Sequence, residues 1–236
     1  MNAPLVVGYR GEIGSFILQG LLKVMPKASD IWCVDINDSD DEVKERINKS
    51  DVIFLCVPIQ ETRNWIYRWT TDRSVKLEDK LIIEQTSLKC NIFEEFSYLK
   101  ILSMHILFRP SKTPNSTDRR IAFVTNSQFD VELVGEILHM TDSSLIEYAT
   151  IQEHDRDMAL IQALTHRILL TLERVQQSSI GSTYISGQVF DLADRIRQGD
   201  RTLYKIIQSN PHLKDIIKKF NQELDNFETW NATSND

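Results

Sequence analysis

The chain has 236 residues, of which 42% are apolar and 26% are charged, and its formal net charge at pH 7 is −7. A chain of this length and composition can bury a real hydrophobic core, and an acidic balance with no basic patch argues against a nucleic-acid partner. The longest apolar runs are only a few residues long, far short of the ~20 needed to cross a bilayer, so no membrane span is expected.

A strand followed by a glycine-rich turn is predicted at the start. Leu5 to Val7 forms the strand and Ser15 to Leu22 a helix, with glycines at positions 8, 11 and 14 between them. Such a turn directs backbone N–H groups and a helix N-terminus at a pyrophosphate. The spacing G-x-x-G-x-x-G is a variant of the commoner G-x-G-x-x-G, and the alternative is a glycine-rich turn that binds nothing.

A second predicted strand, Ile31 to Asp35, ends in an acidic residue. Asp35 follows the glycine-rich turn by the interval of about twenty residues that is typical of dinucleotide-binding units. A carboxylate at this place can accept hydrogen bonds from both adenosine ribose hydroxyls and repels a 2′-phosphate. The expected cofactor is therefore NAD rather than NADP.

Alternating strands and helices continue to about residue 90. Asn37 to Glu42 is expected to cap a short helix that reaches Ile47, and Asp51 to Pro58 has the continuous apolar character of a strand buried on both faces. A helix over Glu61 to Trp69 and a strand over Leu81 to Glu84 follow. Because ligands of open α/β sheets bind at the carboxyl ends of strands, the residues expected on the ligand side are Pro58, Thr62, Ser87 and Lys89.

The first predicted domain ends near residue 150. A strand over Ile101 to Phe108 carries His105 near its end, and the polar stretch Pro110 to Asp118 is predicted as a loop. A strand over Ile121 to Thr125, a helix over Val131 to Met140 and a strand over Leu145 to Tyr148 complete an α/β domain at residues 1–150.

Only helices are predicted beyond this point, in a second domain at residues 151–236. They cover Glu153 to Gln177, Ser186 to Arg197, Arg201 to Ser209 and Leu213 to Phe227. The first carries an apolar stripe from Met158 to Leu172 at three- and four-residue intervals. Four helices are too few to cover this stripe, so a homodimer through the C-terminal helices is expected.

The N-terminus enters the first predicted strand at once, which leaves no room for a signal peptide. Cys33, Cys56 and Cys90 lack the spacing of metal ligands, and the first two lie in predicted core strands. We therefore expect a cytoplasmic protein with buried free thiols and no bound metal.

Five motifs, in the same order, resemble the prephenate and arogenate dehydrogenase family. Glu153 to His166 closely matches the family's E-H-D-x-x-M-x-x-I-Q-A-L-x-H, which is long and specific. Glu84 to Lys89 is similar to D-x-x-S-V-K, and His105 to Pro110 to H-P-M-F-G-P. The turn from Val7 to Gly14 and the strand from Asp51 to Pro58 also match. The resemblance implies a Rossmann-type dinucleotide-binding domain followed by an all-α dimerisation domain.

The family removes a hydride from C4 of a cyclohexadienyl carboxylate onto NAD(P), and the ring loses its carboxylate and becomes aromatic. Loss of the C4 hydroxyl proton needs a positioned base, and the resemblance implies that His105 is that base. Ser87 is expected to bond the same hydroxyl or orient the imidazole, although it could simply cap the next helix. Lys89 is expected to support the turn. His166 is expected to face the substrate across the cleft between the domains.

Two departures affect the substrate side. The proline and glycine of the family's H-P-x-x-G are Ile106 and Arg109 here, and Gly187 stands where the family has the arginine that holds the ring carboxylate. Arg109 or Arg167 is the candidate to supply the missing charge. His154 and Asp155 are interpreted as a hydrogen-bonding pair at a helix N-terminus, because His154 and His166 would point about 120° apart on a regular helix.

The sequence thus predicts an NAD-dependent dehydrogenase acting on prephenate, arogenate or a close analogue. The alternatives are a regulatory NAD-binding homologue that lost the substrate site and, more weakly, a reductase of another carbonyl or imine. The residues expected to bind the cofactor are Gly8, Arg10, Gly11, Glu12, Ile13, Gly14, Asp35, Val57, Pro58 and Thr62.

Overall fold

Two structural units make up the chain, Met1–His154 and Asp155–Asp236. The structure is a computed structural model that describes residues 3–25, 27–113, 115–124, 130–176, 183–199 and 201–233. Thr125 and Gln177, which the sequence places at the ends of a strand and a helix, lie outside these residues.

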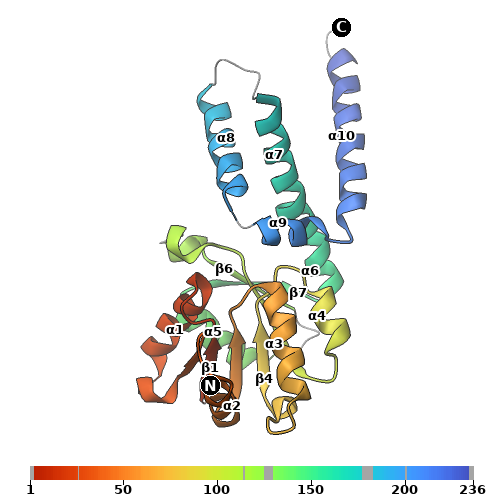
Figure 1. Cartoon of the computed structure of the whole chain (residues 1–236). Helices are drawn as coiled ribbons and strands as arrows, with labels where there is room; N and C mark the ends of the chain where they lie inside the picture. The colour runs from red at the N-terminus through yellow and green to blue at the C-terminus, as the bar shows by residue number, and fades with distance from the viewer. Residues whose placement is uncertain are drawn as a thin grey trace. The chain divides into compact units, whose positions relative to one another are not determined.

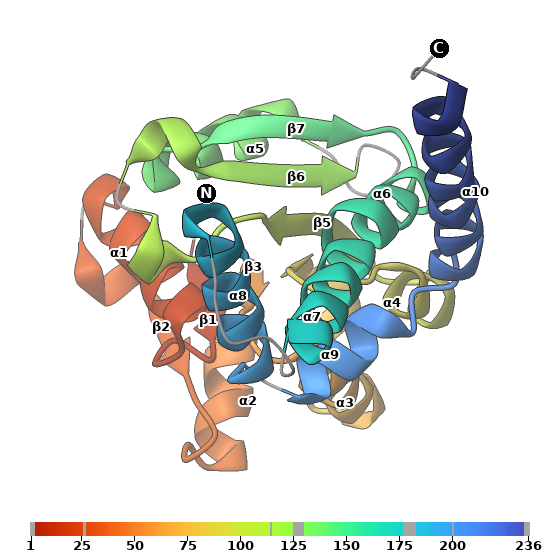
Figure 2. The same cartoon turned by 90° about the horizontal axis from the view of Figure 1, so that it is seen from above.

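The first unit is built on a seven-stranded sheet of order β2-β1-β3-β4-β5-β6-β7. β1 to β5 are mutually parallel, β6 is antiparallel to β5, and β7 is parallel to β6. Figure 2 shows the opposite directions of β5 and β6. The strands are β1 (Pro4–Val7), β2 (Trp32–Val34), β3 (Val52–Leu55), β4 (Leu81–Glu84), β5 (Lys100–Ile106), β6 (Arg120–Val124) and β7 (Ser144–Tyr148).

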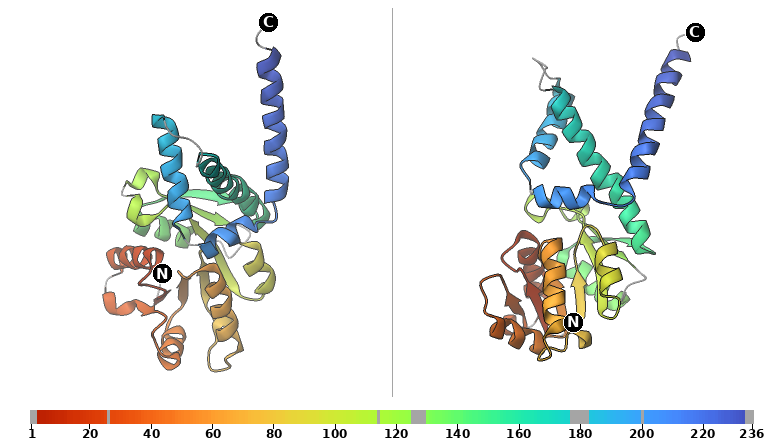
Figure 3. Two further views of the ribbon diagram at one scale, coloured as in Figure 1. Left: turned by 45° about the horizontal axis from the view of Figure 1, so that its top comes forward. Right: turned by 45° about the vertical axis from the view of Figure 1, so that its right-hand side comes forward.

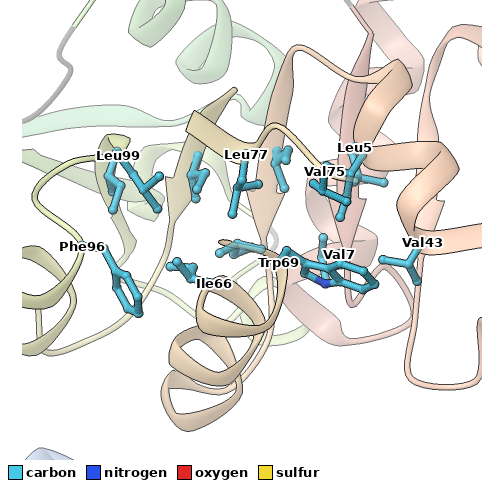
Figure 4. Packing of buried hydrophobic residues seen from close by; sticks show 14 of the residues in the cluster. Leu5, Val7, Val43, Ile66, Trp69, Val75, Leu77, Phe96 and Leu99 are labelled. Carbon is cyan, nitrogen blue, oxygen red and sulfur yellow. The ribbon is translucent and has the colours of Figure 1, made fainter. Parts of the chain in front are cut away.

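Helices cover both faces of this sheet (Figure 1). Because strand side chains alternate, Leu5 and Val7 pack on one face and Val6 on the other. Figure 4 shows part of the first cluster, in which Val43 and Ile66 come from two different helices and Phe96 directly follows a third. The helices on that face are α2 (Asp40–Lys49), α3 (Ile59–Thr71) and α4 (Cys90–Glu95), and those on the other are α1 (Glu12–Val24) and α5 (Val131–Thr141).

A local hydrogen-bonding motif explains where α2 begins. Ser39 begins α2 with a capping box, in which its hydroxyl accepts from the Glu42 N–H and the Glu42 carboxylate accepts from the Ser39 N–H. The cap that the sequence predicted is therefore confirmed.

Cys33 and Cys56 carry free thiols, but both residues are half-buried rather than buried. Burial of the Cys56 thiol raises its pKa to about 12.

The second unit is helical throughout its described residues. Its core gathers Ala159, Ala163, Leu164, Ile207 and Leu213. α7 and α8 lie side by side (Figure 3). The helical segments are α6 (Ile151–Met158), which starts in the first unit, a π-helical segment (Ala159–Leu164), α7 (Thr165–Gln176), α8 (Tyr184–Arg197), α9 (Arg201–Gln208) and α10 (Leu213–Thr233).

The structure thus confirms the predicted α/β fold and the helical region that follows it. Two predictions about the helices were wrong. The helix expected over Glu153 to Gln177 is not uniform, because the segment Ala159–Leu164 is π-helical. The last helix extends to Thr233 instead of ending at Phe227.

Candidate functional site

The glycine-rich turn has the close packing that only glycine permits. Gly8 has a φ of +76°, and a Cβ at this position would lie 2.7 Å from the Cys56 carbonyl oxygen. A Cβ on Gly14 would lie 2.1 Å from the Gly8 carbonyl oxygen. Gly11 precedes α1 and has no side chain to cap it, so the first N–H groups of this helix are available to an anion.

Asp35 is fixed against the same turn by main-chain groups. Its Oδ2 atom accepts from the Arg10 N–H at 3.0 Å and its Oδ1 atom from the Ile36 N–H at 2.9 Å. A carboxylate has about four acceptor sites, so two remain for ligand hydroxyls. The glycine turn and the carboxylate therefore form one preorganised site that fits a dinucleotide.

A cavity of about 500 Å³ lies at the carboxyl ends of β1, β2 and β3. β1 lies between β2 and β3, so the chain reverses its course across the sheet here, which is where doubly wound sheets bind ligands. A larger hollow of about 670 Å³ lies at the opposite edge and contains none of the candidate residues. The expected cofactor residues that line the smaller cavity are Gly8, Gly11, Asp35, Val57 and Pro58.

The other expected cofactor residues support the turn or lie beside it. Thr62 is fully buried, and its hydroxyl lies 3.3 Å from the carbonyl oxygens of both Val57 and Pro58. Ile13 packs against the core under α1. Arg10 and Glu12 line a second cavity of about 390 Å³ beside α1.

His105 is buried near the end of β5, with 6% of its surface exposed. Its Nδ1 atom lies 3.2 Å from the Nε2 atom of His154, which is fully buried. The Tyr148 ring packs edge-on against His154 with their centroids 5.3 Å apart. Burial, then the charge of Lys89 and then His154 lower the pKa of His105 well below its ordinary value. The His105 ring is therefore neutral at neutral pH.

The contact between His154 and His105 was not predicted from the sequence, which predicted only that His154 pairs with its neighbour Asp155. The angular argument that separated His154 from His166 was also wrong, because it assumed a regular helix and the π-helical segment lies between them. The match of both residues to one long motif was the signal that could have prompted a closer look.

The turn after β4 holds Ser87 and Lys89 in different surroundings. Ser87 is half-buried and does not cap the next helix, because α4 starts at Cys90 with Lys89 at its N-cap position. Lys89 is fully buried and paired with Glu84 at 2.7 Å. The buried pair agrees with the expectation that Lys89 supports the turn.

Both candidate substrate arginines are paired. Arg109 Nε donates to Glu12 Oε2 at 3.0 Å, and the Ser111 N–H donates to Glu12 Oε1 at 2.9 Å. Although partial burial opposes it, hydrogen bonds from Ser111 and Arg109 lower the pKa of Glu12. Arg167 Nε donates to Gln208 Oε1 at 3.0 Å, which joins α7 to α9.

His166 and Gly187 both belong to the second unit. His166 is in the first turn of α7, and its buried Nδ1 atom has no hydrogen-bond partner among the described residues. Burial lowers the pKa of its ring. Gly187 lies in the first turn of α8, where its N–H donates to the Thr183 carbonyl.

The described residues contain no group of three or more His, Cys, Asp or Glu side chains that could hold a metal ion. None of the helices in the described part of the chain combines the length and the apolar character needed to cross a membrane.

Comparisons with known proteins agree with this architecture. Residues 150–236 match the family model described as prephenate dehydrogenase, dimerization domain. No curated protein matches the chain.

Solved structures share the fold at low identity. A prephenate dehydrogenase from Aquifex aeolicus in complex with hydroxyphenyl propionate and NAD⁺ has a TM-score of 0.76 at 16% identity, covering 99% of this chain and 92% of that chain. Arogenate dehydrogenase from Synechocystis has a TM-score of 0.66 at 15% identity, with 98% and 92% covered. Pyrroline carboxylate reductase from Plasmodium falciparum with NADP bound reaches 0.51 at 15% identity, with 97% and 92% covered.

The structural likeness concerns the fold, and the family model concerns the helical region. Together they confirm the resemblance that the five sequence motifs predicted. Residues 150–236 match the prephenate dehydrogenase dimerisation-domain family, and the chain shares its fold with prephenate and arogenate dehydrogenases.

Proposed function

We propose that this chain is an NAD-dependent dehydrogenase that oxidises and decarboxylates prephenate, arogenate or a close analogue. The observation that carries the proposal is His105, which is buried near the end of β5 and whose Nδ1 atom contacts His154 on α6. β5 runs parallel to β1, so His105 lies toward the edge of the sheet that carries the glycine turn and Asp35.

The proposal that NAD binds here is based on the glycine-rich turn and the Asp35 carboxylate. The α1 N-terminus would hold the pyrophosphate, and the two remaining acceptor sites of Asp35 would take the ribose hydroxyls. A carboxylate there disfavours a 2′-phosphate, which supports NAD over NADP. When bound, the nicotinamide supplies the acceptor for the hydride that leaves the substrate carbon.

His105 would take the proton of the substrate hydroxyl as the carbonyl forms. The neutral ring has one unprotonated nitrogen, and its tautomer decides which one it is. If Nδ1 donates to His154, Nε2 is the atom that would accept the proton. Ser87 is proposed to bond the same hydroxyl, and His166 to contact the substrate. Breaking the bond to the ring carboxylate releases carbon dioxide and leaves an aromatic ring.

A second candidate function is a regulatory NAD-binding protein that no longer turns over substrate. Three features favour it: Arg109 is paired with Glu12, Arg167 is paired with Gln208, and Gly187 replaces the family's arginine. An unpaired guanidinium is the group best suited to a ring carboxylate. Such a protein would still bind NAD but would no longer have a site for the substrate carboxylate.

The experiment is a steady-state assay of NADH formation with prephenate and with arogenate, run beside calorimetric titration with NAD. Turnover with either substrate supports the dehydrogenase. NAD binding without turnover supports the regulatory protein. Failure to bind either NAD or NADP contradicts both proposals.

A further inference from the structure

A fully buried ion pair joins Glu84, the last residue of β4, to Lys89, which directly precedes α4. Lys89 Nζ lies 2.7 Å from Glu84 Oε1, and both side chains have no exposed surface. Burying two charges costs more than burying apolar groups of the same size, so such a pair is weak evidence for a purely stabilising role. Because the ion pair lies near the candidate base His105, we expect its role to involve that base.

The contacts of Glu84 and Lys89 described here lie in the 85–89 turn and on the part of β5 next to His105. Glu84 Oε1 also accepts from the Ser103 hydroxyl at 2.7 Å, and Glu84 Oε2 accepts from the Thr86 N–H at 2.8 Å. Lys89 Nζ donates to the Met104 carbonyl oxygen at 2.6 Å. Met104 directly precedes His105 on β5, so Lys89 ties the 85–89 turn to the main chain that carries the candidate base.

We propose that Glu84 and Lys89 are positioning residues of the active site: they hold in place the main chain that leads into His105, and they fix the Lys89 ammonium beside the strand that carries this base. The groups that act on His105 from the surrounding elements are Lys89 after β4 and His154 on α6. Glu84 lies behind Lys89 and compensates its charge. This inference rests on the proposed function, since it gives His105 the role of base.

The test measures the protonation of His105 directly. The ring nitrogens of ¹⁵N-labelled protein are titrated by NMR, and the His105 signals are identified by their absence in His105→Asn. Lys89→Met is compared with Lys100→Met, a matched change at an exposed lysine at the start of β5. We expect the His105 midpoint to rise by about one pH unit in Lys89→Met and to stay unchanged in Lys100→Met. An unchanged midpoint in Lys89→Met overturns the proposal.

Two further measurements guard against misfolding of Lys89→Met, which leaves Glu84 buried without a partner. The double variant Glu84→Gln and Lys89→Met removes both charges and should show a rise in the same direction but smaller, because the Glu84 carboxylate no longer favours the imidazolium. In the unmodified protein, Lys89 Nζ should give the signal of a protonated ammonium over the pH range in which His105 titrates. A neutral amine there overturns the proposal without any variant.

The activity arm separates this inference from the proposed function. The acid limb of the kcat/KM profile with prephenate and NAD should move to higher pH in Lys89→Met, because removing a positive charge makes the imidazolium easier to form. A purely structural role of Lys89 would lower stability without moving this limb. If the unmodified protein has no turnover, the proposed function fails while the NMR titration still decides the role of Lys89.

Discussion

The Nδ1 atom of His105 and the Nε2 atom of His154 lie 3.2 Å apart in a buried contact. A hydrogen bond between two neutral imidazoles requires that one nitrogen donate and the other accept. If His105 is to accept a proton on Nε2, its Nδ1 must carry the hydrogen and donate to His154. The partner histidine thus selects the tautomer of the candidate base.

His105→Asn is expected to lower kcat by about 10²–10⁴-fold, the usual contribution of a general base. NAD binding should persist, because no contact of the glycine turn or Asp35 involves His105. The measurement is kcat with saturating substrate beside calorimetry with NAD. His139→Asn, at an exposed position on α5, is the control. Nearly full turnover in His105→Asn would show that His105 is not the general base.

His154→Phe should also lower turnover, because it removes the acceptor that selects the His105 tautomer. His154→Gln retains a side-chain acceptor and should recover part of the loss. We expect roughly tenfold or more between the two variants, as for the outer partners of other functional histidines. The comparison of their kcat values is the measurement. Equal activities would mean that His154 contributes only packing.

Features of the sequence that depend on local spacing predicted the fold and the place of the glycine turn beside Asp35. The turn at Gly8 and the acid at Asp35 lie on adjacent strand ends, so a short motif suffices to bring them together. The contact between His105 and His154 joins residues 49 positions apart, and no local pattern reports it. The contact of Lys89 with the Met104 carbonyl on β5 was missed for the same reason, since Met104 lies outside the motif that contains Lys89.

The cofactor prediction is that NAD binds more tightly than NADP and that Asp35→Ser reduces the difference. The Asp35 carboxylate is held by the N–H groups of Arg10 and Ile36 and cannot turn away from a ribose at low cost. Loss of charge-assisted bonds to the ribose should weaken NAD binding by about ten- to hundredfold. Asp51→Ser, an exposed acid before β3 at the other edge of the sheet, is the control. Tighter binding of NADP by the unmodified protein would contradict this.

A homodimer is expected through the C-terminal helices. Residues 150–236 match a dimerisation domain, and Val175 and Ile185 in this unit are 68% and 72% exposed. Covering such side chains in a partner interface is favourable. Ile185→Asp should therefore weaken the dimer by roughly tenfold or more in light scattering or sedimentation. Tyr67→Asp, at a 62% exposed position on α3, should leave it intact. A monomer at micromolar concentration in the unmodified protein would reject the dimer.

The substrate carboxylate provides the last prediction. The resemblance predicts that Gly187 occupies the position of the family's arginine, while Arg109 and Arg167 are hydrogen-bonded to Glu12 and Gln208. A charge-assisted hydrogen bond to a carboxylate contributes roughly 1.5–3 kcal/mol, or about ten- to hundredfold in affinity. We therefore expect weak binding of prephenate, or a true substrate that is an analogue, and a lower KM for prephenate in Gly187→Arg.

Gly135→Arg is the matched control, because this glycine is also helical and a Cβ there would meet nothing within 4 Å. Steady-state kinetics of both variants with prephenate and arogenate are compared with those of the unmodified protein. If activity appears only in Gly187→Arg, the chain lost its substrate site at this one position. If the unmodified protein has a micromolar KM that Gly187→Arg abolishes, Gly187 was assigned to the wrong family position. We favour a working dehydrogenase, because His105 and His154 form a contact that binding NAD alone does not need.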